Sequence, residues 1–281
     1  MLAKELAPVL TAKHEVLALD HASCDIGDEA ALREKFMDWH PELVVNCAAY
    51  PDVDGCERDP ERAFTVNSRG AGNVARVAEA ISARVFHIST DYVFDGQKRL
   101  PYEEQDATNP ISVYGKSKLE GEKQVFERDG AATRHLILRT SWLYGIHRAN
   151  FVEKILADAH SLPHLEFVAD QVSCPTWTYH LAHKIAELTQ TRATGILHVA
   201  GSGQCSRYEL ACYVVGKISS PVPVSPITWA ELKRPARRPA YSALGSQRLV
   251  ELGLAPLPHW KEALDQYLAL RWGVPAATSG T

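Results

Sequence analysis

The sequence predicts an α/β protein with a doubly wound parallel sheet and a smaller C-terminal α/β lobe. In the first half of the chain, apolar runs of strand length alternate with longer segments of helical periodicity, as in repeated βαβ units. After Trp142 this alternation loosens and prolines become frequent, which indicates a second lobe. A chain of 281 residues is also long enough to bury a large domain that carries a smaller one.

Short apolar runs in the first half are predicted as buried strands. In chain order they are EVLALD at 15–20, LVVNCAA at 43–49, ARVFHIS at 83–89 and LILRT at 136–140. The segments between them have helical patterns, at 28–38, 60–82 and 113–128. Because a crossover helix joins each strand to the next, we expect the strands to be parallel.

The second half is predicted as a lobe that closes over a ligand. A short strand at 195–200 lies between helices at 178–188 and 207–218. Open α/β sheets bind ligands at the carboxyl ends of their strands, where such a lobe would sit. We expect a nucleotide-binding domain at 1–145, a mainly substrate-binding lobe with segments returning to the sheet at 146–273, and a disordered tail at 274–281.

The composition disfavours several classes of partner. The formal net charge is -4, so no basic field attracts nucleic acid or an anionic membrane. No run approaches the roughly 20 apolar residues that span a bilayer, and no signal-peptide pattern opens the chain. The cysteines are dispersed, and nothing near His180 and His183 completes a ligand set. We therefore expect reduced thiols, no metal site, a cytoplasmic location and a small-molecule partner, with a homodimer left open.

The strongest local motif is Y-G-K-S-K at 114–118. Tyr114 and Lys118 are one helical turn apart, so their side chains share a helix face about 6 Å apart along the axis. An ammonium group beside a phenol favours the phenolate and lowers the phenol pKa, which makes the pair a usable general acid or base. A surface Tyr and Lys on an amphipathic helix is the simpler alternative.

A second motif, S-T-D-Y-V-F-D-G at 89–96, follows a predicted strand and precedes the tyrosine motif. It places hydroxyl and carboxylate groups at the rim of the sheet, where ligands bind. A hydroxyl there can hold a ketone oxygen toward the tyrosine proton. The same hydroxyl could instead serve only a local turn or helix cap.

Taken together, these motifs resemble the extended short-chain dehydrogenase/reductases, and in particular the dTDP-4-dehydrorhamnose reductases. The resemblance extends from about residue 1 to 268 and includes N-C-A-A-Y at 46–50, V-N at 66–67, R-T-S-W at 139–142, D-Q at 170–171 and A-R-R-P at 236–239. It implies a Rossmann-like fold and an enzyme that reduces a sugar-ring ketone with NADPH or NADH. The implied substrate is a nucleotide sugar.

The resemblance also implies roles for the motif residues. Tyr114 would donate a proton to the ketone oxygen, Lys118 would hold the nicotinamide ribose and lower the phenol pKa, and Thr90 would orient the carbonyl. Asp20 would accept hydrogen bonds from the adenosine ribose, which favours NADH. Further positions that would contact the cofactor are Asp25, Ile26, Cys47, Ala48, Ala49, Tyr50 and Asn67. Asn67 could equally be a helix-interior residue that is satisfied locally.

Several positions match family residues that face the deoxysugar and its nucleotide: Val53, Asp54, Tyr92, Trp142 and Asn150. Arg237 or Arg238 could pair with the diphosphate, because a guanidinium group meets phosphate oxygens two at a time. Either arginine could instead form a surface ion pair. Trp142 could also serve only to pack the core.

The start of the sequence departs from the family pattern. Doubly wound dinucleotide folds begin with a strand, a Gly-rich turn and a helix, whereas this sequence opens at the helix, over 1–10. We expect either that Met1 lies inside a longer reading frame or that the pyrophosphate cradle has been lost. The sequence as given is expected to bind NAD(P)H poorly and to leave neighbouring strands unpaired.

Alternatives from different classes stay open at this point. One is a reductase that makes dTDP-L-rhamnose or a related deoxysugar. Another is a non-catalytic binding subunit of the same fold, like the regulatory subunit of methionine adenosyltransferase. The presence of Thr90, Tyr114 and Lys118 together favours the enzyme. An epimerase or dehydratase of another nucleotide sugar would need additional carboxylates beside the tyrosine, and the sequence shows none there.

Overall fold

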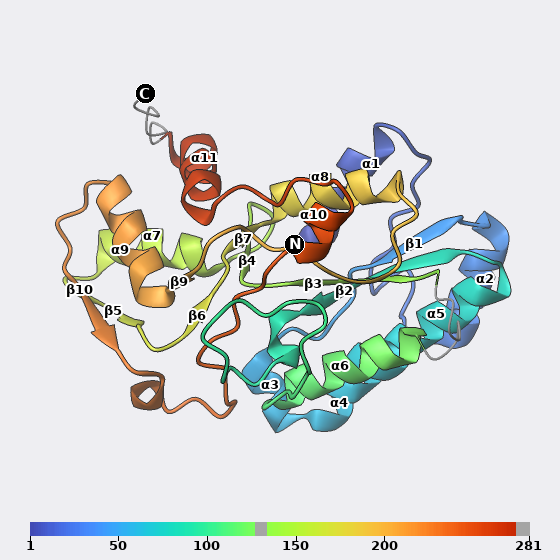
Figure 1. The fold of residues 1–281 in the computed structure, drawn as a ribbon, viewed down its shortest axis with the longest axis horizontal. Coiled ribbons are helices and arrows are strands. Elements are labelled where there is room, and N and C mark those ends of the chain that lie inside the picture. The colour runs from blue at the N-terminus through green and yellow to red at the C-terminus, as the bar shows by residue number, and fades with distance from the viewer. Residues whose placement is uncertain (127–133, 274–281) are drawn as a thin grey trace.

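The computed structural model describes residues 1–126 and 134–273 and confirms the α/β prediction (Figure 1). In the described part of the chain, the central sheet has the parallel strand order β1-β2-β3-β8. These strands are β1 (Leu43–Asn46), β2 (Arg84–Thr90), β3 (Leu136–Thr140) and β8 (Gly195–His198). The predicted strands at 43–49, 83–89 and 136–140 are thus present. The strand predicted at 195–200 pairs with β3 in this sheet, so this part of the second half returns to it.

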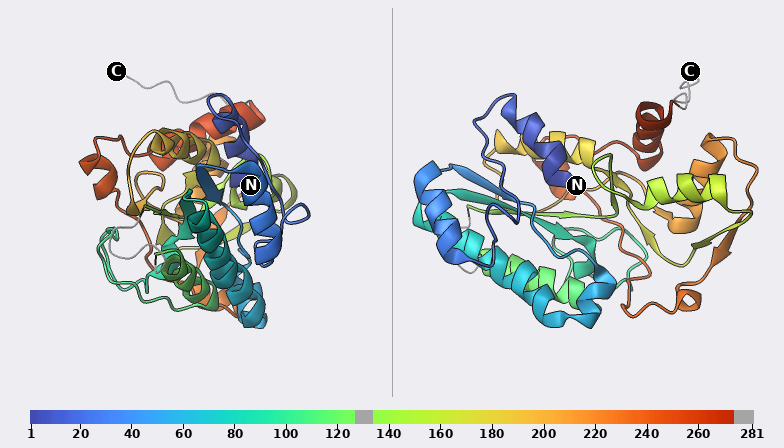
Figure 2. Two further views of the ribbon diagram at one scale, coloured as in Figure 1. Left: turned by 90° about the vertical axis from the view of Figure 1, so that its right-hand side faces the viewer. Right: turned by 180° about the vertical axis from the view of Figure 1, so that it is seen from behind.

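Helices cover both faces of the sheet (Figures 1 and 2). On one face lie α2 (Glu29–Trp39), α5 (Ala71–Ala80) and α6 (Val113–Phe126), and on the other lie α1 (Leu2–Thr11), α8 (Thr178–Thr189) and α10 (Gln247–Glu251). Leu6 of α1 and Leu181 of α8 pack with Phe86 of β2, while Phe36 of α2 and Val77 of α5 pack with β2 from the other side. Apolar stripes on helices of both layers therefore bury the sheet between them.

The helix predicted at 60–82 is interrupted. It consists of α4 (Pro60–Phe64), a π-helical turn (Thr65–Gly70) and α5, and α3 (Val53–Arg58) precedes it. The wide turn presses against α6, because a Cβ atom at Gly121 would lie 2.1 Å from the Asn67 carbonyl oxygen. Single π-helical turns often lie at functional sites, and this one carries Asn67. The predicted helix at 113–128 is present as α6 to Phe126, and its last residues lie outside the described part.

The strand predicted at 15–20 is wrong: this segment has no regular secondary structure and belongs to no sheet. β1 pairs with β2 on one side only, and a cavity of about 1910 Å³ is lined by residues 15–20, by β1 and by α1. Leu17 and Leu19 remain 42% and 37% exposed. A strand forms only where a neighbour accepts and donates its backbone hydrogen bonds, and no strand pairs with this segment among the described residues.

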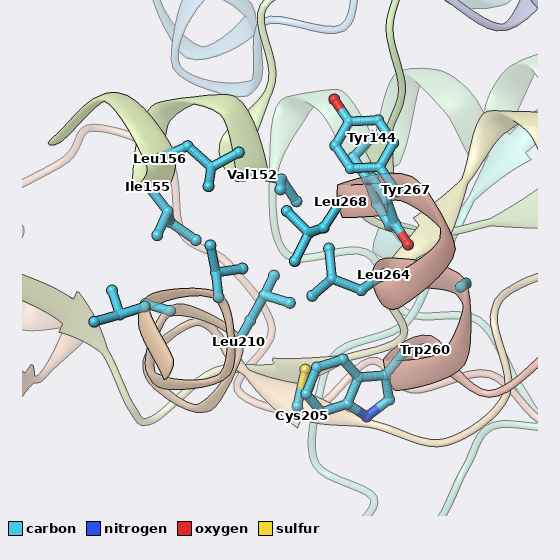
Figure 3. Packing of buried hydrophobic residues seen from close by; sticks show 14 of the residues in the cluster. Tyr144, Val152, Ile155, Leu156, Cys205, Leu210, Trp260, Leu264, Tyr267 and Leu268 are labelled. Carbon is cyan, nitrogen blue, oxygen red and sulfur yellow. The ribbon is translucent and has the colours of Figure 1, made fainter. Parts of the chain in front are cut away.

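The second group of elements packs around its own core. It contains α7 (Phe151–Ser161), α9 (Arg207–Lys217), α11 (Trp260–Trp272), and the parallel pair β5 (Leu165–Val168) and β10 (Val224–Ile227). Figure 3 shows side chains from α7, α9 and α11 meeting in this core, with Tyr144 beside Tyr267. The predicted helices at 178–188 and 207–218 correspond to α8 and α9. The tail predicted as disordered lies outside the described residues.

Short elements connect the two groups. β4 (Leu143–Tyr144) pairs with β7 (Thr176–Trp177), and β6 (Val172–Ser173) pairs with β9 (Cys205–Ser206). Short 3-10 turns lie at Asp91–Val93 and Trp229–Leu232. Within the described ranges, no helix combines the length and apolar character needed to cross a bilayer.

Candidate active site

The large cavity lies at the carboxyl ends of β1, β2 and β3 and reaches the first turn of α6. Most of the sequence-predicted site residues line it: Asp20, Asp25, Ile26, Cys47, Ala48, Ala49, Tyr50, Val53, Thr90, Tyr92, Tyr114, Lys118, Trp142 and Asn150. Asn67, Asp54, Arg237 and Arg238 lie outside this lining. The fold therefore brings together residues that are up to 130 positions apart in the sequence, from Asp20 to Asn150.

The first turn of α6 places Tyr114 beside the loop after β2. A Cβ atom at Gly115 would lie 2.2 Å from the carbonyl oxygen of Tyr92, so only glycine allows the helix to approach this loop. The Ser112 hydroxyl accepts a hydrogen bond from the Gly115 amide at 3.1 Å. The rings of Tyr92 and Tyr114 then meet edge to face, with centroids 5.9 Å apart. The glycine of Y-G-K-S-K thus positions the tyrosine.

The surroundings of Tyr114 keep its phenol protonated. Enclosure by the protein raises the pKa of Tyr114, and the nearby Asp91 adds to this, whereas a hydrogen bond with the Thr90 side chain opposes it. The net shift of the Tyr114 pKa is therefore upward, opposite in direction to the lowering that the sequence predicted. A protonated phenol is the form that donates a proton.

The side chain of Lys118 is directed toward β2. Its Nζ donates a hydrogen bond to the Ile88 carbonyl oxygen at 2.6 Å and lies 3.1 Å from His87 Nε2. Burial lowers the pKa of Lys118 to about 8, while Glu122 and Cys47 oppose this shift. The amine can therefore gain or lose a proton near neutral pH, and it is held by backbone rather than by Tyr114.

A buried polar network beneath the site was not anticipated from the sequence. His87 is fully buried, and its Nδ1 lies 3.2 Å from Asn46 Nδ2. Because Asn46 Oδ1 accepts the Ala48 amide at 3.1 Å, the Asn46 amino group faces the histidine. One signal was available: His87 and Arg139 are polar residues inside predicted central strands, where a buried polar side chain must find a partner.

The loop after β2 uses its polar groups to join the two halves of the molecule. Thr90 Oγ1 donates to Asp91 Oδ1 at 3.0 Å and accepts the Tyr92 amide at 3.2 Å, so this hydroxyl also serves the local turn. Asp91 accepts hydrogen bonds from Ser173 and Ser242 at 2.9 and 2.5 Å. Burial raises the pKa of Asp91 to about 6, and these hydroxyl donors oppose that shift. Asp91 was not singled out by the sequence.

At the other end of the cavity, the predicted cofactor residues form exposed turns. Asp20 Oδ1 accepts the Ser23 amide at 2.9 Å, and Asp25 Oδ1 accepts the Gly27 amide at 2.8 Å. Asn67 does not line the cavity but braces the chain beside it, since its Oδ1 accepts the Tyr50 amide at 2.8 Å and its Nδ2 donates to the Tyr50 carbonyl at 3.2 Å. Its partners are therefore distant in sequence rather than local.

The residues present fit a nicotinamide dinucleotide along most of its length. The cavity runs from the turns at Asp20 and Asp25 past small wall residues at 47–49 to Lys118. Met1 and the first turn of α1 line its middle, and no side chain caps this helix N-terminus. Uncapped amides at a helix N-terminus suit a pyrophosphate.

The predicted substrate residues differ in their placement. Trp142 lines the cavity with a left-handed backbone conformation, φ 39°, of the kind that concentrates at functional sites. Asp54 and Arg238 do not reach the cavity; they bind each other through two hydrogen bonds of 3.2 Å. Asn150 lines the cavity but caps α7, with its Oδ1 accepting the Val152 amide at 3.0 Å. Arg237 is exposed.

Arg207 also lines the cavity, although the sequence did not single it out. The guanidinium carbon of Arg207 lies 3.6 Å from the ring centroid of Trp142 and 4.3 Å from that of Phe151. These partners are distant from Arg207 in sequence, so no local motif indicated the contact.

A parallel sheet with helices on both faces, and a cavity at its carboxyl edge that gathers Thr90, Tyr114 and Lys118, define an extended short-chain dehydrogenase/reductase. Comparison with known proteins narrows this class. The chain belongs to the family described as RmlD substrate binding domain, whose model matches residues 1–271.

Individual relatives agree with this assignment. A dTDP-4-dehydrorhamnose reductase of Mycolicibacterium smegmatis is 40% identical over 285 residues, which cover 100% of this chain and 85% of the relative. The crystal structure of a dTDP-4-dehydrorhamnose reductase from Clostridium acetobutylicum superposes with a TM-score of 0.91 at 36% identity, covering 96% of this chain and 95% of that one. The Bacillus anthracis enzyme, crystallised in complex with NADP, gives 0.89 at 31% identity, covering 94% and 95%.

Proposed function

We propose that this protein reduces the 4-keto group of dTDP-4-dehydro-L-rhamnose with NADPH or NADH and so produces dTDP-L-rhamnose. The observation that carries the proposal is the Tyr114 phenol, kept protonated and hydrogen-bonded with Thr90 in a cavity that also reaches Asp20 and Asp25. Relatives that share about two fifths of the sequence over the whole chain carry the name of this activity.

The chemistry divides between cofactor and protein. The reduced nicotinamide supplies the hydride that adds to the ketone carbon. When the Thr90 hydroxyl turns its single proton from Asp91 to the substrate, a ketone oxygen between Thr90 and the Tyr114 phenol accepts hydrogen bonds from both, which orients and polarises the carbonyl. Tyr114 then gives its proton to this oxygen, so that the ketone becomes an alcohol.

Lys118 completes the proposed proton balance. Proton donation leaves a phenolate, which must regain a proton before the next turnover. With a pKa near 8, Lys118 can release its own proton toward the phenolate and regain one from solvent. Its bond to the Ile88 carbonyl keeps the amine at the inner wall of the site, where ribose hydroxyls of the cofactor would be held.

Two features bear on the cofactor and substrate. The Asp20 carboxylate disfavours a 2′-phosphate and so supports NADH, whereas the homologous crystal structure with NADP supports NADPH. The proposal therefore includes both cofactors, and their kcat/KM values with the wild-type protein would rank them. For the sugar, Val53, Tyr92 and Trp142 remain the proposed contacts because they line the same cavity as Tyr114.

The test is NAD(P)H oxidation in the presence of dTDP-4-dehydro-L-rhamnose, with the product identified by NMR. We expect turnover by the wild type and a fall in kcat of about 10²- to 10⁴-fold for Tyr114→Phe. Tyr213→Phe is the matched control, because its hydroxyl bonds Asp265 at 2.9 Å outside the cavity lining. A Tyr114→Phe variant with wild-type turnover would show that the proton donor is wrong. A folded wild type without turnover would refute the reductase.

A further inference from the structure

Arg207 lies in the part of the cavity lined by Trp142 and Phe151, and it forms no ion pair with any described residue. Among residues 1–126 and 134–273, no carboxylate is within salt-bridge distance of its guanidinium group and no hydrogen bond holds it. It is fixed instead by the rings of Trp142 and Phe151, with the guanidinium carbon 3.6 and 4.3 Å from their centroids. Aromatic stacking leaves the N–H groups at the edge of the guanidinium plane free for a ligand.

The position of Arg207 is electrostatically unfavourable for a cation. It is the first residue of α9, where the helix dipole places partial positive charge. Burial lowers the pKa of Arg207 to about 10, and Arg238 lowers it further, whereas Tyr92 and Asp91 oppose the shift. Burial, the helix N-terminus and a second guanidinium group all disfavour a positive charge at this position. An anion that binds beside Arg207 is therefore favoured.

The neighbouring arginines are less suited to this role. Arg238 already binds Asp54 through two nitrogens and does not line the cavity. Arg237 is exposed and also lies outside the lining. Arg148 lines the cavity but is exposed, so solvent screens its charge.

We propose that Arg207 binds the diphosphate of a nucleoside diphosphate sugar, with Trp142 and Phe151 holding its guanidinium group in place. This inference rests on the proposed function, since a nucleotide-sugar substrate carries the required diphosphate. The N–H groups of one guanidinium can meet two phosphate oxygens at once, which fixes the position of the nucleotide relative to Thr90 and Tyr114. Arg207 replaces Arg237 and Arg238 as the proposed diphosphate ligand.

Calorimetric binding of dTDP and of thymidine separates a diphosphate contact from a structural role. We expect Arg207→Gln to weaken dTDP binding by about 10- to 100-fold and thymidine binding less than about twofold, because charge-assisted hydrogen bonds to the diphosphate are lost. Arg207→Lys keeps the charge but not the paired geometry, so its loss should be intermediate. Arg148→Gln is the matched control and should change dTDP affinity less than about threefold.

Three results would overturn the assignment: unchanged dTDP affinity in Arg207→Gln, equal losses for dTDP and thymidine, or an equal loss in Arg148→Gln. If Arg207→Gln does not fold, the Arg207→Lys comparison decides by the same criteria. Arg207-dependent dTDP binding without ketosugar turnover would refute the reductase but keep this site. Turnover with dTDP binding independent of Arg207 would refute this site alone.

Discussion

Replacing Glu122 by glutamine should remove a buried charge pair that anchors α6 under the active site. Glu122 Oε1 accepts Arg139 Nε at 2.9 Å, Oε2 accepts Arg139 Nη2 at 2.7 Å, and Ser89 Oγ donates to Oε1 at 2.5 Å. Both charged side chains are only 3% exposed. Glutamine keeps the volume but turns one acceptor into a donor that faces the guanidinium group.

The expected loss in the free energy of unfolding is about 3 to 5 kcal/mol, because removing one partner leaves a buried charge without its counter-ion. For a urea slope of about 3 kcal/mol/M, this moves the unfolding midpoint down by roughly 1 to 1.7 M. Glu122 also raises the pKa of Lys118, so this pKa should fall below about 8 in the variant. The assays are urea unfolding followed by circular dichroism and the pH profile of kcat.

Two further variants test whether the loss of stability comes from the unpaired buried charge. Glu120→Gln breaks an exposed pair with Lys123 at 3.4 Å and should lose less than about 0.5 kcal/mol. Adding Arg139→Met to Glu122→Gln should recover stability, because the unpaired charge disappears with it. A loss below about 1 kcal/mol for Glu122→Gln, or a double variant that is less stable than the single one, would contradict the account.

Three other changes have defined outcomes. Gly115→Ala should lower kcat by at least about tenfold, since its Cβ would meet the Tyr92 carbonyl at 2.2 Å and displace Tyr114; activity and structure of the variant check this. Asn150→Ala should lower unfolding free energy by about 1 kcal/mol through loss of the α7 cap, measured in urea. Burial lowers the pKa of His198 from 6.5 to about 3, so the folded state binds fewer protons than the unfolded state in this range. The stability that neutral His198 contributes is therefore present above pH 6.5 and is lost as the pH falls from 6.5 toward 3. His198→Asn should consequently lessen the fall in the urea midpoint between about pH 7 and 5.

Sequence patterns identified the elements whose stability is local or whose burial is complete. β3 has all five residues buried, and its apolar run predicted both of its ends. The segment at 15–20 has an equally good strand pattern, but strand formation depends on a neighbour, which no local pattern can report. The π-helical turn that carries Asn67 likewise lies in close contact with α6. The pattern of apolar residues over 60–82 does not indicate it.

The same distinction applies to the site. Thr90, Tyr114 and Lys118 lie in two compact motifs, so the sequence could point to them, and the fold places all three on one cavity. Arg207 depends on rings at 142 and 151 that only the tertiary fold brings to it. The direction of the Tyr114 pKa shift depends on enclosure by the protein, which motif spacing cannot show.

The unpaired side of β1 affects how the protein behaves in concentrated solution. Leu43–Asn46 presents amide and carbonyl groups that no other strand uses in the described part of the chain, and Leu17 and Leu19, which line the same cavity, expose apolar surface. Where such a border stays uncovered, a strand from another molecule can pair with it, so copies with an uncovered border should self-associate by edge-to-edge strand pairing as concentration rises. Light scattering that increases with concentration, and that is suppressed by Leu17→Lys on the exposed surface beside β1, would identify this border as the site of self-association.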